Sequence, residues 1–338
     1  RDGVSPAQGL LEKWPVDGPK LAWKTRGVGT GFSSVAVVKG RIYTMGDGAD
    51  SSHVICLNAK DGKIIWTSKA VGKTGGNYKG TRSTPTVVGD VLYALGQFGD
   101  LVCLNTADGS EVWRTSLTQD FGGRAGGWNY TESVLVDDGK VMVTPGGRKG
   151  AVVALNAKTG KLIWQSTDFT DGAQYSSLIA RNFGGIRQYI QLTGQNVVGL
   201  GANTGEVLWK APRSGRTATI STPVFHEGSL FVSSAYGVGC NGFEVKVDDG
   251  KFTTRQTYAN KSMANHHGGV IRVGNFVYGS SGGTLACLNL KTGEEMWRER
   301  SAGKGSIVIV GKQIILRPES GPVSLVEVNP TKYMEISR

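Results

Sequence analysis

The fold is decided by the stretch Leu155-Asn156-Ala157-Lys158-Thr159-Gly160-Lys161-Leu162-Ile163-Trp164, because its pattern of a glycine followed four residues later by tryptophan recurs along the chain. The recurring glycines are Gly62, Gly109, Gly160, Gly205 and Gly293, each four residues before a tryptophan. A degenerate copy has Gly250 but carries Thr254 in place of the tryptophan. Neighbouring copies lie about 45 residues apart, a period typical of a four-stranded propeller blade.

The tryptophans of the pattern have an expected structural role. Each should lie on the last, outermost strand of its blade, where a large ring buries about 150–250 Å² against the neighbouring blade. The residues are Trp66, Trp113, Trp164, Trp209 and Trp297, and Trp23 stands in a further segment, Pro19–Thr25, that resembles a lone last strand. The turn glycine should have a positive φ, which suits a short hairpin turn with a bulge.

An earlier half of each copy has runs of β-branched and aromatic residues around a Gly or Asp turn, which predict a hairpin. These hairpins are expected at residues 33–43, 83–93, 133–143, 177–190, 222–232 and 268–278. A C-terminal copy at Val326–Pro330 lacks both the glycine and the tryptophan. The sequence therefore predicts an all-β propeller of four-stranded antiparallel blades, with residues 1–338 forming one domain.

The number of blades is predicted as seven to eight. Seven periods follow Trp23, and the orphan strand before them completes either the final blade or an eighth one. If residues 333–338 are the last strand of period seven, an eight-bladed parent is favoured over a seven-bladed ring. The chain starts at Arg1 without Met or an apolar leader, so we expect a processed product whose signal segment is absent.

Composition agrees with many turns and a packed core. The 338 residues include 51 glycines, only 10 prolines and 39% hydrophobic residues, and no apolar run is long enough to cross a membrane. Cys56, Cys103 and Cys287 occupy the same position in different copies, too far apart for disulfides, so we interpret them as buried packing residues. Cys240 lies outside this column.

The segment 155–164 and its repeats resemble the pyrroloquinoline quinone (PQQ)-like propeller repeat over nearly the whole chain. That family includes quinoprotein dehydrogenases, which hold PQQ and Ca²⁺, and non-catalytic scaffolds such as the outer-membrane assembly lipoprotein BamB. The segments Gly127–Ser133 and Asn265–Gly269 resemble those of secreted or periplasmic PQQ-like proteins of planctomycetes and related bacteria. The resemblance implies a bacterial protein in the periplasm or outside the cell.

The chemistry of a quinoprotein dehydrogenase is not visible in the sequence. The resemblance would require two adjacent cysteines beneath PQQ, and Glu, Asn and Asp for Ca²⁺ and base catalysis. No Cys-Cys pair is present, and the acidic residues fall mostly in turns instead of an oxygen-rich cluster. We therefore expect no cofactor and no catalytic residue.

Candidate ligand contacts lie where the copies differ, at the start of each first strand, which is expected to line the channel mouth. They are Arg82, Trp128, Tyr130, Glu132, Tyr175, Asn265, His266, His267 and Lys304. Such residues suit a polar or anionic ligand, although they also suit a plugged or hydrated channel. No metal is expected at His266–His267, because neighbouring strand residues point to opposite faces.

The net charge of +11 is spread through turns and strand ends, without the clustered basic face of a nucleic-acid-binding protein. Three functions remain open. The first is a non-catalytic extracytoplasmic binding or assembly scaffold with a protein partner. The others are a PQQ-dependent alcohol dehydrogenase-like quinoprotein, and a protein that binds a carbohydrate or anionic ligand at the channel. The oligomeric state is not predicted.

Overall fold

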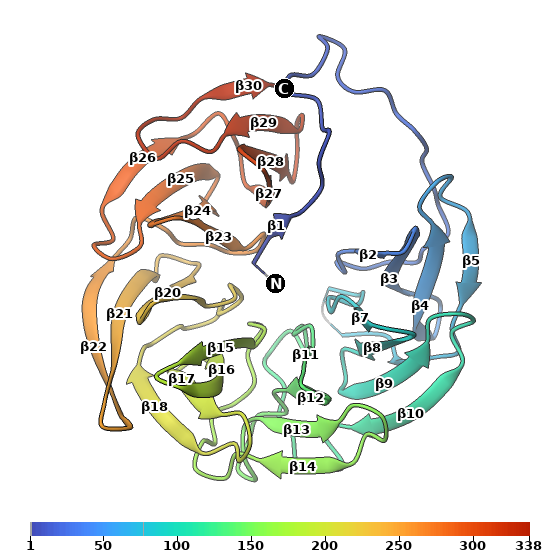
Figure 1. The fold of residues 1–338 in the computed structure, drawn as a ribbon. Helices are drawn as coiled ribbons and strands as arrows, with labels where there is room; N and C mark the ends of the chain where they lie inside the picture. Colours follow the sequence, from blue (N-terminus) through green and yellow to red (C-terminus); the bar gives the residue numbers. More distant parts are fainter. Residues whose placement is uncertain (1, 77) are drawn as a thin grey trace. The chain divides into compact units, whose positions relative to one another are not determined.

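The computed structural model describes residues 2–76 and 78–338, which contain thirty strands and no helix. The strands form seven sheets, each with four consecutive antiparallel strands (Figure 1). The protein is a β-propeller, as the repeat predicted. By its internal contacts the chain divides into two compact units: unit 2 contains Leu21–Ala180 and Leu200–Val207, and unit 1 contains the remaining residues.

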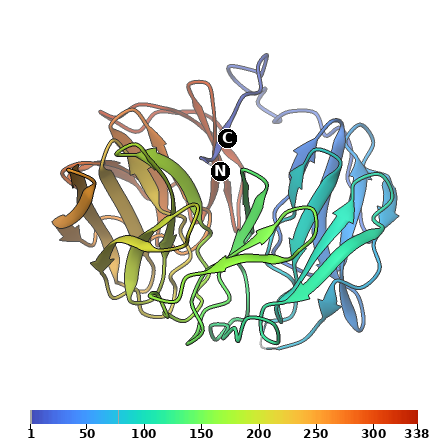
Figure 2. The same cartoon turned by 60° about the horizontal axis from the view of Figure 1, so that its bottom comes forward.

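Unit 2 contains three sheets, whose strands lie side by side in chain order from the first, inner strand to the fourth, outer strand (Figures 1 and 2). Their strands are β2 (Ala36–Val38), β3 (Arg41–Asp47), β4 (Ser51–Asn58), β5 (Ile64–Thr67) and the short β6 (Gly72–Lys73) beside β4; β7 (Thr86–Val88), β8 (Val91–Leu95), β9 (Asp100–Asn105) and β10 (Glu111–Ser116); and β11 (Leu135–Asp137), β12 (Lys140–Val143), β13 (Val153–Asn156) and β14 (Leu162–Gln165).

Unit 1 contains the other four sheets, apart from the few residues of β15, β17 and β18 that belong to unit 2. Their strands are β15 (Ile179–Phe183), β16 (Ile186–Leu192), β17 (Asn196–Gly201) and β18 (Val207–Pro212); β19 (Val224–His226), β20 (Ser229–Ser234), β21 (Gly239–Asp248) and β22 (Lys251–Asn260); β23 (Val270–Val273), β24 (Phe276–Ser281), β25 (Thr284–Asn289) and β26 (Glu295–Glu299); and β27 (Gly305–Val310), β28 (Gln313–Pro318), β29 (Ser324–Glu327) and β30 (Glu335–Ser337), with β1 (Val4–Ser5) parallel to β27.

The tryptophans lie on outer strands, as expected, and Trp66, Trp113 and Trp164 each contact the turn glycine of the following copy. A Cβ placed on Gly109 would lie 2.7 Å from the Trp66 ring, and one on Gly160 would lie 2.8 Å from the Trp113 ring. Gly109 has φ +75, so its turn needs glycine for both conformation and space. The indole Nε1 of Trp113 also donates to the Ala157 carbonyl at 3.0 Å. The repeat motif therefore encodes one packing contact between successive copies within unit 2.

The segment Pro19–Thr25 is not a strand, which corrects the sequence interpretation. Trp23 nevertheless occupies the expected place: its ring lies on Gly62, where a Cβ would come within 2.4 Å, and its Nε1 donates to the Ala59 carbonyl at 3.0 Å. The seventh sheet takes its fourth strand, β30, from residues 335–337. The choice between seven and eight blades stays a prediction, as does the single domain.

Tyr258 replaces the tryptophan that the degenerate copy has lost. The hairpin β21–β22 has two strands of ten residues, so the outer strand extends past Thr254. Tyr258 packs on Gly293, where a Cβ would lie 2.4 Å from the ring, and its hydroxyl donates to the Leu290 carbonyl at 2.9 Å. The contact is thus preserved with a different residue, four positions later.

The core lies between sheets, and the cysteines belong to it. Cys56, Cys103 and Cys287 are at most 1% exposed and unpaired, which confirms that they are buried packing residues, and Cys240 is buried as well. Burial raises the pKa of the Cys103 thiol to about 11. These thiols are therefore protonated at neutral pH and serve as small apolar groups.

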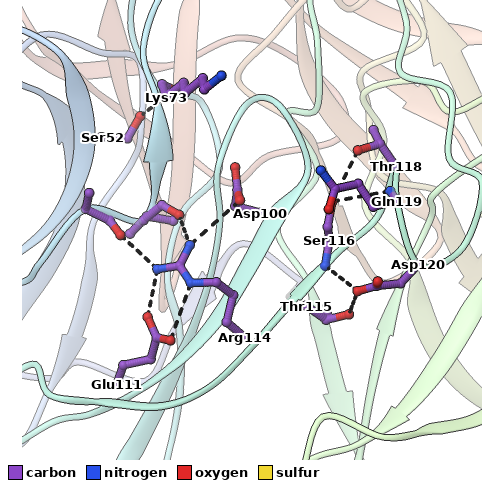
Figure 3. A network of polar contacts seen from close by, with 12 residues as sticks. Ser52, Lys73, Asp100, Glu111, Arg114, Thr115, Ser116, Thr118, Gln119 and Asp120 are labelled. Carbon is purple, nitrogen blue, oxygen red and sulfur yellow. Dashed lines mark hydrogen bonds and ion pairs between the residues drawn. The ribbon is translucent and has the colours of Figure 1, made fainter.

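Polar contacts complement the ring contacts at the outer strands. Arg114, next to Trp113 on β10, forms an ion pair with Glu111 at 2.7 Å and donates to the carbonyls of Ala70 and Val71 (Figure 3). In unit 1, Arg298 next to Trp297 repeats the arrangement with Glu295 and the Ser262 carbonyl. The arginine thereby joins its outer strand to the segment that follows the preceding sheet.

Candidate functional site

The starts of the inner strands in unit 2 are joined by a series of hydrogen bonds. The backbone N–H of Ser34 donates to Thr84 Oγ1 at 3.1 Å, that of Thr84 to Ser133 Oγ at 2.9 Å, and that of Ser133 to Ser177 Oγ at 3.1 Å. The Ser and Thr side chains at this level therefore connect successive sheets. Because these side chains are used to connect the sheets, the contacts to a ligand would come from the other residues nearby.

Three of the candidate residues are buried and bonded to the fold. Tyr130 is 1% exposed and donates to the Pro145 carbonyl at 2.8 Å, and burial raises the pKa of its phenol. Glu132 is also 1% exposed, and its Oε2 accepts the N–H of Thr144 at 2.9 Å. In unit 1, Asn265 accepts from Ser221 Oγ at 2.6 Å and donates to the Ser280 and Gly269 carbonyls. The structure gives these three residues structural contacts in the interior.

Arg82 and Trp128 are half-buried and form the accessible part of the group in unit 2, whereas Tyr175, which they neighbour, is only 7% exposed. The Arg82 guanidinium lies 5.4 Å from the ring centre of Phe32 and donates to the Gly80 carbonyl at 3.1 Å. The Trp128 ring meets Tyr175 edge to face at 5.7 Å, and its backbone N–H donates to the Tyr175 hydroxyl. Burial lowers the pKa of Arg82, while Asp47 and Tyr175 act in the opposite direction.

A buried acid that the sequence argument did not single out lies in the same unit. The carboxylate of Asp47, 5% exposed, accepts from Ser52 Oγ at 2.8 Å, from Gln97 Nε2 at 3.0 Å and from Thr74 Oγ1. Asp47 ends β3, at a position that Gly146, Ala235 and Gly282 occupy in other copies and Gln97 in the next one. That departure from the repeat was the signal available in the sequence.

His266, His267 and Lys304 come together in unit 1 with two residues not predicted, Tyr236 and Glu319. Nε2 of His267 lies 2.5 Å from Glu319 Oε1, and Lys304 Nζ lies 3.0 Å from the same oxygen. The Tyr236 hydroxyl lies 3.3 Å from His266 Nε2, and the two histidine rings are 4.9 Å apart. These five side chains are called the histidine cluster below.

The histidine cluster corrects one step of the sequence argument. His266 and His267 lie in irregular backbone between β22 and β23, so the alternation of a strand does not apply and both rings occupy one cluster. Within residues 2–76 and 78–338, no three His, Cys, Asp or Glu side chains are grouped as a metal site requires. The arrangement offers a carboxylate, an ammonium group, two imidazoles and a phenol for polar contacts.

We expect Glu319→Gln to lower the pKa of His266. Burial, Lys304 and His267 already lower this pKa, and the Glu319 carboxylate opposes them by favouring the imidazolium. Removing the negative charge leaves Lys304 uncompensated, so the imidazole should lose its proton at a lower pH. NMR titration of the imidazole resonances measures the shift. Glu227→Gln, which alters a carboxylate beside His226 instead, is the control, and an unchanged His266 titration in Glu319→Gln would contradict the assignment.

The PQQ and Ca²⁺ of quinoprotein dehydrogenases do not fit the residues present. The four cysteines come from four different strands, β4, β9, β21 and β25, and each is buried and unpaired. Glu132 and Asn265 are the candidate residues of the types that bind Ca²⁺ in those enzymes. Both are already hydrogen-bonded to the backbone in the interior.

The repeat, the sheets and the tryptophan contacts together define a propeller of PQQ-like repeats. A family model described as outer membrane protein assembly factor BamB matches residues 14–94 and 50–299. The chain belongs to this BamB family.

Individual relatives are distant. The BamB of Yersinia pestis is 25% identical over 162 residues, which cover 45% of this chain and 40% of that protein, so the match spans less than half of the relative. The crystal structure of BamB from Moraxella catarrhalis has a TM-score of 0.63 at 18% identity, covering 89% of this chain and 83% of that one. A europium-containing methanol dehydrogenase has a TM-score of 0.57 at 13% identity, covering 87% and 72%. At these identities the two structures establish the shared fold alone.

Proposed function

We propose that this protein is a non-catalytic scaffold that acts outside the cytoplasm, in the periplasm, and binds a protein partner during outer membrane protein assembly. Membership of the BamB family supports a role in outer membrane protein assembly. Among the described residues no helix is long and apolar enough to cross a membrane.

One observation carries the choice of a scaffold over a channel enzyme. The acid, phenol and amide at the inner strand starts, Glu132, Tyr130 and Asn265, are at most 1% exposed and hydrogen-bonded to the fold. A catalytic acid or a ligand-binding amide has to reach its substrate. These side chains instead hold strand ends together, which is the role expected in a scaffold.

The surface that suits a protein partner in unit 2 contains Phe32, Tyr78, Arg82 and Trp128, and is called the aromatic–arginine surface. Phe32 and Tyr78 are 64% and 70% exposed, and Arg82 contacts both through its stacking on Phe32 and its hydrogen bond to the Tyr78 carbonyl. Aromatic residues and arginine dominate the energetics of protein interfaces. We place the partner contact here.

In cells, deletion of the gene should reduce the amounts of outer membrane proteins, and the wild-type gene should restore them. The double variant Phe32→Ala/Arg82→Ala should fail to restore them while melting at the wild-type temperature. Leu162→Ala/Ile163→Ala, which removes two exposed apolar residues from β14, is the matched control and should restore them. Full activity of the double variant would exclude the aromatic–arginine surface, and a deletion without effect would exclude the assembly role.

The quinoprotein alternative has a separate test. Purified protein incubated with PQQ and Ca²⁺ should acquire no stoichiometric quinone absorbance and should not reduce a dye with alcohols. Binding of PQQ together with dye reduction would overturn the scaffold proposal.

A further inference from the structure

A pocket of about 700 Å³ in unit 1 is lined by none of the residues of the histidine cluster. It is lined by the inner strands β15, β19 and β23 and by Asp2 and Val4 at the N-terminal strand β1. Figure 1 shows β1 beside β27 and near β23. A volume of this size accommodates a small organic ligand.

Basic side chains line this pocket from all three strands: Arg181 from β15, His226 from β19 and Arg272 from β23. Arg181 Nε donates to the Phe225 carbonyl at 3.4 Å, and Arg272 Nη1 donates to the Gly274 carbonyl at 2.7 Å. Burial lowers the pKa of Arg181, and the nearby Arg187 and Arg272 lower it further. Two guanidinium groups held close in a partly buried place favour the approach of an anion.

Asp2 supplies a negative charge to this pocket from the chain itself. Its carboxylate favours the charged form of Arg181, and its Oδ1 accepts the backbone N–H of Val4 at 3.1 Å. The other acid at the pocket, Glu227, has a side chain 75% exposed and lies 3.7 Å from Nε2 of His226. Both acids are exposed, but Asp2 is the one whose carboxylate acts on Arg181, so an incoming anion would compete with Asp2 for this guanidinium.

The strand that carries Asp2 into place is short. β1 pairs with β27 through only two residue pairs, Val4 with Ile309 and Ser5 with Val310. The Gly3 carbonyl accepts one further bond, from the Ile309 N–H at 3.0 Å. A segment with so few contacts opens at a low free-energy cost.

The pocket also has apolar walls. Phe183 and Phe225 meet edge to face with ring centres 5.2 Å apart, and Val224 and Val270 are each 9% exposed. Aromatic and aliphatic walls around a few polar groups are typical of sites for small organic ligands. The pocket thus matches a ligand with a charged end and an apolar body.

We propose that this pocket binds an organic anion, with a carboxylate or phosphate group between Arg181 and Arg272 and an apolar body against Phe183 and Phe225. The ligand displaces the Asp2 carboxylate. The site is independent of the scaffold function, because none of its residues belongs to the aromatic–arginine surface or to the histidine cluster.

Isothermal titration calorimetry with phenyl phosphate, phenylacetate and inorganic phosphate tests the proposal on the whole protein. The two aromatic anions should bind more tightly than inorganic phosphate, and their relative affinities distinguish a phosphate from a carboxylate site. Arg272→Ala should weaken binding by about tenfold or more, as expected for loss of a charge-assisted hydrogen bond. Asp2→Asn should strengthen it, since the competing charge is removed.

The gain in Asp2→Asn cannot arise from misfolding, so it keeps the test valid even if an arginine variant is unstable. Arg148→Ala, at an exposed arginine of unit 2, is the matched control and should bind like the wild type. Unchanged affinity in both Arg272→Ala and Asp2→Asn would overturn the proposal, as would equal weakening in Arg148→Ala. Restoration of outer membrane proteins in cells is a separate readout, so failure of one proposal is distinguishable from failure of the other.

Discussion

Trp164→Ala is expected to lower the free energy of unfolding by ~3–5 kcal/mol, as is usual for loss of a large buried aromatic side chain. The Trp164 ring is 7% exposed and lies on Gly205, where a Cβ would come within 2.3 Å of the ring. Its Nε1 donates to the Ala202 carbonyl at 3.2 Å, and this acceptor would lose its partner. Urea denaturation followed by circular dichroism measures the change, with the slope as a check on two-state behaviour.

The partner of this contact gives a second variant of the same prediction. Gly205→Ala should also destabilise, because the methyl group meets the ring and because φ is +74 at this position. In the double variant the methyl group no longer meets a ring, so the combined loss should be smaller than the sum of the single losses. Trp128→Ala, at a half-exposed ring outside the repeat column, should cost less than Trp164→Ala. Additive losses, or a loss below about 1 kcal/mol for Trp164→Ala, would mean that the contact does not stabilise the fold.

Arg213→Ala should destabilise unit 1 by about 3 kcal/mol, because it strands three polar groups in the interior. Arg213 is 5% exposed and donates to Asn241 Oδ1 at 2.9 Å, to Ser234 Oγ at 2.6 Å and to the Gly239 carbonyl at 3.2 Å. Burial lowers its pKa to about 10, so the guanidinium remains charged at neutral pH and its hydrogen bonds are charge-assisted.

The matched control for Arg213 is Arg255→Ala on β22. Arg255 pairs with Glu244 at 2.9 Å, but its side chain is 69% exposed, so its removal should change stability by no more than about 0.5 kcal/mol. Thermal and urea unfolding of both variants provide the measurement. Equal losses of unfolding free energy in the two variants would show that the buried contacts of Arg213 stabilise the fold no more than an exposed ion pair does.

The repeat made most of the fold predictable. A glycine and a tryptophan at constant separation identified the outer hairpin of each sheet, and runs of β-branched residues identified the inner one. Tyr258 could not be predicted, because the ten-residue strands of the β21–β22 hairpin move the ring four residues along the chain. Trp23 was assigned to a strand because its neighbours follow the repeat, whereas its contact with Gly62 requires only the ring.

The candidate site was harder to predict, because sequence position alone does not determine burial. Glu132 was expected at a channel mouth, yet it lies at the position where Ser33 in another copy accepts a backbone N–H from Met45, and it makes the corresponding bond to Thr144. Of the histidine cluster, His266, His267 and Lys304 were predicted. Glu319 and Tyr236 were not, because they come from loops that are distant in the sequence. Nothing in the sequence pattern distinguishes Arg181 and Arg272 from the other basic residues, and only the folded strands bring both to one pocket.

The placement of each tryptophan on the glycine of the next copy has a consequence for how such proteins evolve. Every copy from Gly62 to Trp164 carries both partners of this packing contact. Its glycine contacts the ring of the preceding copy, and its tryptophan, four residues later, contacts the glycine of the next copy. Duplication of one such segment would therefore add another tryptophan–glycine contact without changing the contacts of its neighbours. The series is interrupted at Trp209, whose ring packs on Gly199 of its own sheet and whose Nε1 donates to Gln188. A copied segment that ends at Trp209 would therefore make no ring contact with a glycine of the next copy. Gain or loss of whole copies should be tolerated better before Trp209 than after it.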